Sequence, residues 1–554
     1  MKKFWAIVLL VFLGSLGPVF WGIYHPSPTD LVMQLPVLEG GRVKPLDTLA
    51  RNFLLTTRGK QTVDLAGHSV SAQTWTLATL FRGDASETSP IFRIDDPTLL
   101  GIIGVEVGKK RYFSYRDIAP FFPILEEQSR GADEVEANSR TVFQRNLLRL
   151  RSSVSYYGRL KNTMGLRGQD APFYVFPPLS GKFPTWLSFG DGVSQGLSGA
   201  PLHPLVPDWI RVAQWVQEGK LDAHVADLER THAGIAQHWS PMARPVYWEW
   251  LFNQWSPFYT SMIVYLAAFC VVLLGWLLGR QAFQMVGFQL AAGAFGVHSL
   301  GIIIRMFLQG RPPVTNLYTS AVFVGWVAIL LGLVLEQRSK RGFGTVVASV
   351  MGFLTLIIAH HLSYQGDTME MMQAVLDSNF WLSTHVVTVT MGYGATFLAG
   401  FLAHLYLFRG IFSRDFTQED QKTLTGMVFG VLCFALFFSF TGTVLGGIWA
   451  DQSWGRFWGW DPKENGALMI VLWNAAILHA RQGGIIRERG MMLMAIFGNI
   501  VTAFSWFGVN MLGVGLHSYG FMDKAFFWLV LFVFLEVMMI WLGSLPRHYW
   551  RNKP

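Results

Sequence analysis

The chain has 554 residues, of which 51% are hydrophobic and only 14% are charged. A soluble protein of this length would carry about a quarter charged residues, so this composition excludes an ordinary soluble class and indicates a membrane protein. The formal net charge is +8, but the basic residues follow a topological pattern, so the charge gives no case for nucleic-acid binding.

Apolar runs of about 20 residues, the length that a helix needs to cross a bilayer, recur along the chain. Only helices and closed barrels satisfy their backbone hydrogen bonds in lipid. We therefore predict an all-α polytopic membrane protein of about ten transmembrane helices. The predicted spans are 4–24, 259–278, 283–308, 315–335, 343–361, 380–408, 424–447, 464–480, 490–512 and 524–543.

Three domains follow from these spans. Residues 1–24 are predicted to be an uncleaved membrane anchor, because the run is long for a signal peptide and no clear small-x-small site precedes His25. Residues 25–257 have an ordinary composition and are predicted to form a large extracytoplasmic domain. This domain opens with LPVLEGGRVKPLDTLAR, which indicates a turn followed by a helix start, and physics alone assigns it no function. Residues 258–554 form a multi-span membrane domain.

Basic residues fall in alternate loops between the predicted spans. These basic positions are Lys2, Lys3, Arg280, Arg338, Lys340, Arg341, Arg409, Arg414, Lys422, Arg481, Arg487, Arg489, Arg547, Arg551 and Lys553. The other short loops hold little beyond Arg311, Arg456 and Lys463. With ten spans every basic loop falls on one side, so the positive-inside rule predicts that both termini are cytoplasmic.

The sequence lacks the motifs that are typical of several reaction classes. Cys270 and Cys433 both lie inside predicted spans, and there is no C-x-x-C pair, so the chain is not a thiol–disulfide exchanger. The absence of C-x-x-C-H excludes a covalently attached haem of its own. No phosphate-binding loop is present, which argues against transport driven by its own ATP hydrolysis.

The segment 446–464, GGIWADQSWGRFWGWDPKE, holds Trp449, Trp454, Trp458 and Trp460 within twelve residues. It separates two apolar runs and is therefore predicted to lie at the outer membrane surface. The interleaved glycines let a planar ligand approach the backbone, and indole faces offer a stacking surface. We interpret the segment as a platform for a large flat ligand. The alternative is an ordinary interfacial belt of tryptophan.

The end of this segment has a local structural logic. Asp461 is predicted to cap the helix that starts at Pro462, and Glu464 completes a capping box. Such a cap fixes the tryptophan-rich segment to the next span. The spacing does not show whether Asp461 also contacts a ligand.

Two histidines share the predicted side of the tryptophan-rich segment. His385 begins the span 380–408, and His517 follows the span 490–512. Imidazole is the usual axial ligand of haem iron. We therefore favour a bis-histidine haem site at the lipid–water boundary over two interfacial histidines bonded to backbone.

Three more histidines, His298, His404 and His479, lie within or near the ends of predicted spans. Ionisable groups at such depth are costly and often functional. His404 and His479 both fall toward the cytoplasmic ends of their helices, whereas His298 is nearer the middle of the membrane. For each, an interhelical hydrogen bond is an equally good interpretation.

The sequence WGRFWGWDPKE, with WADQSW upstream, resembles the WWD signature of haem-handling proteins in cytochrome c biogenesis. From about residue 290 onward the chain is similar to the CcsA/ResC type of the system II cytochrome c synthase. Supporting matches are GRPPVTNLYTSAVFVGW at 310–326, NAAILHAR at 474–481 and MLGVGLHSYG at 511–520. GGRVKPLDT resembles a segment found in fused CcsB–CcsA chains.

This resemblance implies roles for individual residues. His385 and His517 would be the external axial ligands of haem iron, and the tryptophan-rich segment would cradle the haem. His479 would be one of two membrane histidines that receive haem from the cytoplasmic side. The family's other membrane histidine belongs to the CcsB/ResB half, which is missing here, so a ResB-like partner or His404 or His298 would replace it. Asn465-Gly466 also departs from the bulkier pair that many members carry there.

The implied function is cytochrome c biogenesis in a bacterial cytoplasmic (inner) membrane. Haem b, as a transiently bound substrate, would be delivered outward and joined covalently to apocytochrome c at C-x-x-C-H, with no catalytic residues beyond the haem ligands. The implied partners are apocytochrome c, a ResB/CcsB-like membrane protein and an extracytoplasmic thiol reductant. The alternatives are a CcmF-type system I lyase, a haem transporter without ligation and a b-type quinol-oxidising cytochrome subunit.

Overall fold

A computed structural model of the chain describes residues 2–164, 173–178, 185–199, 201–238, 240–512 and 523–551. The chain divides into two compact units. The membrane unit comprises Met1–Ser15, Ser256–Leu362 and Met372–Pro554. The second unit, called here the α/β unit, comprises Leu16–Trp255 and Ser363–Met371.

The described residues of the membrane unit form helices joined by turns and loops. Its main helices are α1 (Lys2–Ser15), α14 (Pro257–Leu277), α15 (Gln281–Gln309), α16 (Leu317–Ser339), α17 (Phe343–Leu362), α18 (Asn379–Trp381), α19 (Val387–Phe412), α20 (Gln418–Trp454), α21 (Pro462–Gln482), α22 (Glu488–Ala503), α23 (Val509–Met511) and α24 (Asp523–Ser544). Two short π-helices, η8 (Leu382–Val386) and η9 (Phe504–Gly508), interrupt this pattern.

The all-α polytopic fold predicted from the sequence is confirmed. In the described residues, eight helices are long and apolar enough to cross a membrane, or nine if the bent pair Ala6–Ser15 and Gly17–Tyr24 counts as one span. The predicted span 464–480 coincides with α21, which is not among these eight because polar residues occupy both its ends and Asn474 lies between them. The count of ten spans stays a prediction.

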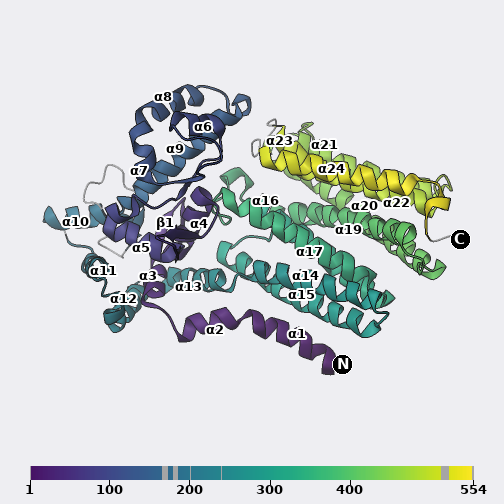
Figure 1. Cartoon of the computed structure of the whole chain (residues 1–554), viewed down its shortest axis with the longest axis horizontal. Coiled ribbons are helices and arrows are strands. Elements are labelled where there is room, and N and C mark those ends of the chain that lie inside the picture. The colour runs from purple at the N-terminus through teal and green to yellow at the C-terminus, as the bar shows by residue number, and fades with distance from the viewer. Residues whose placement is uncertain are drawn as a thin grey trace. The chain divides into compact units, whose positions relative to one another are not determined.

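Helices that follow one another in the sequence pack as hairpins. The pairs α14–α15, α16–α17 and α19–α20 are in close contact, and α1 lies against α15 (Figure 1). Small residues permit the close approach, as in membrane helix pairs generally. A Cβ atom at Gly344 of α17, for example, would lie 2.2 Å from the carbonyl oxygen of Gly332 of α16.

The α/β unit combines short strands with helices. Its strands are β1 (Pro36–Glu39), β2 (Arg42–Pro45), β3 (Thr62–Leu65), β4 (His68–Ser71), β5 (Phe92–Arg93), β6 (Tyr112–Phe113), β7 (Tyr174–Phe176) and β8 (Leu187–Ser188). Its helices are α2 (Gly17–Tyr24), α3 (Pro28–Met33), α4 (Leu46–Arg58), α5 (Ala72–Arg82), α6 (Pro97–Ile102), α7 (Tyr115–Ile118), α8 (Phe122–Asp133), α9 (Val142–Lys161), α10 (Phe189–Leu197), α11 (Val206–Glu218), α12 (Val225–His238) and α13 (Ser240–Trp255), with the short turn η6 (Ser363–Gln365).

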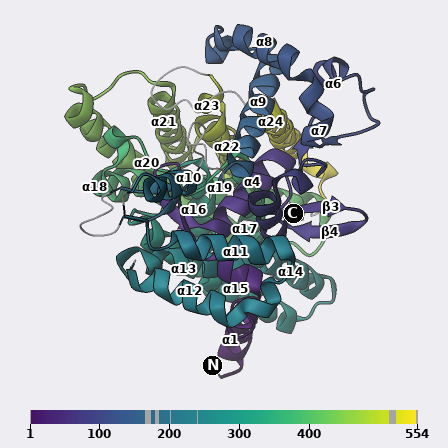
Figure 2. The same ribbon diagram turned by 90° about the vertical axis from the view of Figure 1, so that its left-hand side faces the viewer.

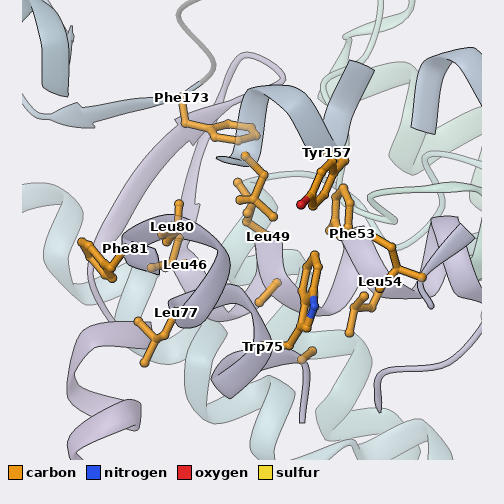
Figure 3. Close-up of a cluster of buried hydrophobic side chains, with 14 of the residues drawn as sticks. Leu46, Leu49, Phe53, Leu54, Trp75, Leu77, Leu80, Phe81, Tyr157 and Phe173 are labelled. Carbon is orange, nitrogen blue, oxygen red and sulfur yellow. The ribbon is translucent and has the colours of Figure 1, made fainter. Parts of the chain in front are cut away.

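One apolar core holds this unit together (Figure 3). Phe53 of α4 stacks on Trp75 of α5 with ring centroids 5.4 Å apart, and Tyr157 of α9 closes the cluster. Strands β2, β1, β7 and β8 form an antiparallel sheet in that order. Strands β3 and β4 form a separate hairpin, seen in Figure 2.

The motif GGRVKPLDT occupies the β1–β2 hairpin and the start of α4. Gly40 and Gly41 form the two-residue turn, with φ of 62° and 78°, a conformation that glycine adopts without strain. The sequence indicated the turn and the helix start, but the four-residue strands on either side are too short for a clear alternating pattern.

A buried ion cluster surrounds β2. Arg42 donates two hydrogen bonds to Glu249 of α13 at 2.8 and 3.0 Å, and two to Asp367 at 2.7 and 3.0 Å. Lys44 donates to Asp367 at 2.8 Å and also to Glu39. Burial alone would raise the pKa of Asp367, but the charges and hydrogen bonds of the two cations outweigh it and hold the pKa well below its usual range.

We expect this cluster to make the stability of the α/β unit sensitive to acid. A carboxyl whose folded pKa is depressed stabilises the fold above its unfolded pKa of about 4, and this contribution is lost as the pH falls below that value. The melting temperature of the full-length protein in detergent should therefore fall between about pH 5 and pH 3, and less steeply in Asp367→Asn. Because carboxylates outside the cluster titrate alike in both proteins, the difference isolates the cluster around Asp367, and parallel curves would contradict the prediction.

Candidate functional site

The tryptophan-rich segment begins on a helix and ends on a short loop. Helix α20 continues through residue 447, where the predicted span ends, as far as Trp454 and is capped by Gly455 in the left-handed region. Its 37 residues span about 55 Å, whereas the hydrocarbon core is about 30 Å thick. Helix α20 is therefore longer than the hydrocarbon core is thick. Trp449 and Trp454 lie on its last turns, whereas Trp458 and Trp460 lie on the loop that follows.

His385 lies in the π-helix η8, against the glycines of α20. Its Nδ1 is 2.8 Å from the carbonyl oxygen of Gly442. A carbonyl only accepts, so Nδ1 carries a proton and donates this hydrogen bond. A Cβ atom at Gly446 would lie 2.5 Å from the Cε1 atom of the imidazole. Gly442 and Gly446 are spaced as Gly-x-x-x-Gly. Because they lack side chains, they leave the space on α20 that the imidazole ring of His385 fills.

An aromatic wall adjoins this histidine. The ring of His385 meets Trp449 edge-on, with centroids 5.8 Å apart. Trp449 in turn stacks on Trp381 of α18 at 6.2 Å and an interplanar angle of 10°. The phenyl ring of Phe457 folds back over Gly447, where a Cβ atom would lie 2.5 Å from it. An imidazole beside parallel indoles is suited to a planar ligand that contains a metal.

The loop itself is rigidly attached to α21. The predicted capping box is present: the side chain of Asp461 accepts from the backbone of α21, and Glu464 accepts from the backbone of Asp461 and of Gly459. Lys463 donates to two backbone carbonyls of η9, at 3.0 and 3.1 Å. Trp460 is 72% exposed and has a φ of +57°, a strained conformation for a bulky residue. Strain and exposure together are typical of a ligand-binding position.

His517 lies outside the described residues. The segment before it contains η9, the second π-helix of the membrane unit, so π turns occur at His385 and shortly before His517. Such widened turns are rare and frequently mark functional sites.

The three membrane histidines lie in different surroundings. His298 is fully buried, with Nδ1 3.4 Å from the hydroxyl of Tyr265. His404 uses both ring nitrogens, Nδ1 toward the carbonyl of Gly400 and Nε2 toward Glu536 at 3.1 Å. His479 bonds the carbonyl of its own helix through Nδ1 and is exposed on the surface of the membrane unit. Among the described residues, no hydrogen bond or ring contact joins His404 to His479.

Two features were missed by the sequence analysis. Trp381 precedes His385 by one helical turn, and this i, i+4 spacing could have identified it as a neighbour of the site. Arg311 holds Asp377 with two hydrogen bonds of 2.6 and 2.8 Å, in the loop that leads to α18. No cluster of three or more metal-ligating side chains is found within the part of the chain that the structure describes.

Comparisons with known proteins identify similar sequences and a similar structure. Residues 314–517, which include the tryptophan-rich segment, match the family described as Cytochrome C assembly protein. The cytochrome c biogenesis protein CcsA of Chlorella vulgaris is 30% identical over 282 residues, covering 44% of this chain and 89% of that protein. A CcsA of Prochlorococcus marinus is 27% identical, covering 47% of this chain and 93% of its own length.

A longer relative covers most of the chain. Protein NrfI of Wolinella succinogenes is 25% identical over 516 residues, which is 88% of this chain. This chain spans only 54% of the length of NrfI. Among solved structures, the cytochrome c haem lyase CcmF matches 52% of the chain and 49% of its own length with a TM-score of 0.38 and 15% identity.

We expect Gly446→Leu to expel the imidazole of His385 from its place against α20, because even a Cβ atom at 446 would overlap the ring. The reaction of His385 with diethyl pyrocarbonate, measured by peptide mass spectrometry, should then become several times faster. Gly430→Leu is the matched control on the same helix, since a Cβ atom there meets nothing within 4 Å. Equal rates in both variants and the parent would contradict the packing described here.

Proposed function

The chain belongs to the CcsA-type family of cytochrome c assembly proteins, and from that premise we propose that it delivers haem across the membrane and presents it for covalent attachment to apocytochrome c. The proposal includes the sidedness predicted from the charged loops, with both termini cytoplasmic and the tryptophan-rich segment outside. The single observation that supports it most directly is the imidazole of His385 between the glycines of α20 and the Trp449–Trp381 stack.

The residues of the site are suited to haem in three respects. The Nδ1 hydrogen bond of His385 orients the ring, and Nε2 is the nitrogen that we propose binds iron. The indoles supply apolar stacking area for a porphyrin face. The exposed Trp460 and Phe457 (72% and 48%) leave the loop open to an arriving polypeptide. We propose His517 as the second axial ligand, on the resemblance to the family.

The proposed attachment reaction balances without a further oxidant. Each cysteine S–H of an apocytochrome C-x-x-C-H segment adds across one vinyl C=C of haem. A carbon–sulfur bond forms, the vinyl π bond breaks and the hydrogen passes to the other vinyl carbon. The protein's residues bind and orient the haem, and the vinyl groups supply the reactivity. Both thiols must be reduced beforehand, which is the role proposed for an extracytoplasmic thiol reductant.

We also propose a cytoplasmic-side entry point at His479. The hydrocarbon core is about 30 Å thick, so a haem held at the outer site cannot also contact the opposite end of the helices. His479 is exposed on the surface of α21, which is compatible with a ligand contributed by a ResB-like partner. His404 is bonded at both ring nitrogens and would have to release Glu536 to serve instead.

His385→Ala should lower the yield of holocytochrome c by at least about tenfold, because a vacant axial position leaves the iron and the vinyl groups unoriented. Added imidazole should partly restore both the yield and the low-spin spectrum of bound haem. The measurement is the absorption spectrum of the purified protein together with haem-stained reporter cytochrome. His361→Ala removes another exposed histidine of the membrane unit and should leave both unchanged. Normal maturation in His385→Ala would refute the ligand assignment, and haem flux without thioether formation would favour a transporter.

Trp449→Leu should weaken haem binding about fivefold, since an aromatic stacking contact contributes about 1 kcal/mol beyond burial. Trp449→Phe should retain most of the affinity, because it keeps a stacking face. Haem-to-protein ratios after titration measure this difference. Trp528→Leu changes an exposed tryptophan of α24 and serves as the control for a membrane belt. If Leu and Phe at 449 behave alike, the tryptophans act as a belt and not as a platform.

A further inference from the structure

The GGRVKPLDT motif has no part in the function proposed above, yet its residues converge on one side chain. Arg42 and Lys44 are two residues apart on β2, so their side chains leave the same face of the strand. Both donate to Asp367, Arg42 with two hydrogen bonds and Lys44 with one. Three hydrogen bonds from two cations hold the Asp367 carboxylate, in a cluster where Lys44 is only 2% exposed.

The turn of the GGRVKPLDT motif contacts the chain segment that contains Asp367. The side chain of Met371 packs over Gly41, where a Cβ atom would lie 3.3 Å from the Cγ atom of Met371. Asp367 also accepts from the backbone N–H of Met369, which is buried. The short turn η6 at the start of this segment packs against α4. Gly41, the two cations and helix α4 thus all contact residues 363–371.

These residues belong to the segment 363–378, called here the strap, which joins α17 to α18. The chain continues from the strap through α18 to His385, the proposed haem ligand. The first nine residues of the strap are part of the α/β unit, and the chain then returns to the membrane unit. Within the membrane unit, Arg311 holds Asp377 near the end of the strap. His385 follows Asp367 by eighteen residues. The strap therefore has an anchor in each unit.

The direction of His385 depends on what restrains the chain before it. A π turn contains one residue more than an α turn, and each helical residue turns the chain by about 100°. If η8 relaxed to α-helical geometry, Trp381 and His385 could change direction by as much as about 100° relative to α20. Because π turns are rare, we infer that the surrounding structure restrains η8 in this form. The chain enters η8 from the strap through α18.

We propose that Arg42, Lys44 and Asp367 are positioning residues for His385, and that the GGRVKPLDT hairpin acts by anchoring the strap. This inference rests on the proposed role of His385 as a haem ligand. The residues that hold Asp367 then act on His385 through the strap.

The test compares Asp367→Asn with Asp64→Asn in the full-length protein. Asp367→Asn leaves two cations, Arg42 and Lys44, with two carboxylates, Glu39 and Glu249, so the cluster stays balanced. Asp64→Asn removes a carboxylate that pairs with Arg58 at the edge of the same unit, and it is the matched control. Both are made in a background with Cys270 and Cys433 replaced by serine and with Gln373→Cys as a reporter in the strap.

Two quantities are measured in each variant. The rate of maleimide labelling at Gln373→Cys reports the freedom of the strap and requires no haem. The low-spin fraction of bound haem, with and without imidazole, reports the position of His385. We expect Asp367→Asn to label at least about five times faster and to lose most of its low-spin signal, with recovery in imidazole, while Asp64→Asn matches the parent. Arg42→Lys, which keeps the charge but loses the forked geometry, should be intermediate.

The outcomes separate this inference from the proposed function. Unchanged labelling in Asp367→Asn and Arg42→Lys would overturn the anchor. Faster labelling with an unchanged haem spectrum would overturn the positioning role. The positioning role would also be overturned if the low-spin haem signal fell only as far as the amount of folded protein fell and imidazole did not restore it. Parent protein that binds no haem would refute the proposed function, whereas the labelling rates would still decide whether the strap is anchored.

Discussion

The close approach of α20 to the start of α19 is the constraint on which the candidate site depends. Gly442 and Gly446 lie one helical turn apart, and added Cβ atoms would meet the backbone of Val389 at 2.6 Å and the ring of His385 at 2.5 Å. Lipid offers no hydrophobic drive for helix association, so such small-residue contacts carry much of the packing. In this protein the same contact also sets the tautomer of the histidine, because the accepting carbonyl belongs to Gly442.

A second buried polar group stabilises the other side of α19. His404 contacts Glu536 of α24 at 3.1 Å, and Asn499 of α22 donates to the same carboxyl at 3.2 Å. Gly400 gives room for this network, since a Cβ atom there would lie 2.1 Å from the Oδ1 atom of Asn499. Helix α19 is therefore held to three neighbours by polar contacts and glycines, so its N-terminal end is a well-defined place for a ligand.

Much of the fold could be predicted because its signals are local. Hydropathy locates helices of about 20 residues, and a Pro with flanking acids locates the start of α21. The neighbours of His385 were not predictable in this way. Gly442 and Trp449 are 57 and 64 residues away in the sequence, and glycine spacing indicates close packing without naming the partner. The ion cluster was hidden for the same reason, because Glu249 and Asp367, two of its three carboxylates, come more than 200 and 300 residues after Arg42.

The length of α20 has a mechanical consequence. A continuous helix of about 55 Å is stiff, so a tilt within the bilayer is transmitted undiminished to its projecting end. The last seven residues of α20 extend about 10 Å beyond the predicted span, so its end lies about 25 Å from the middle of the bilayer, and a tilt of about 10° displaces that end sideways by about 4 Å. This is the thickness of an aromatic ring. Small rocking motions of α20 would therefore be enough to open or close a slot between Trp449 and Trp381, and the helix would work as a lever that converts membrane tilt into access.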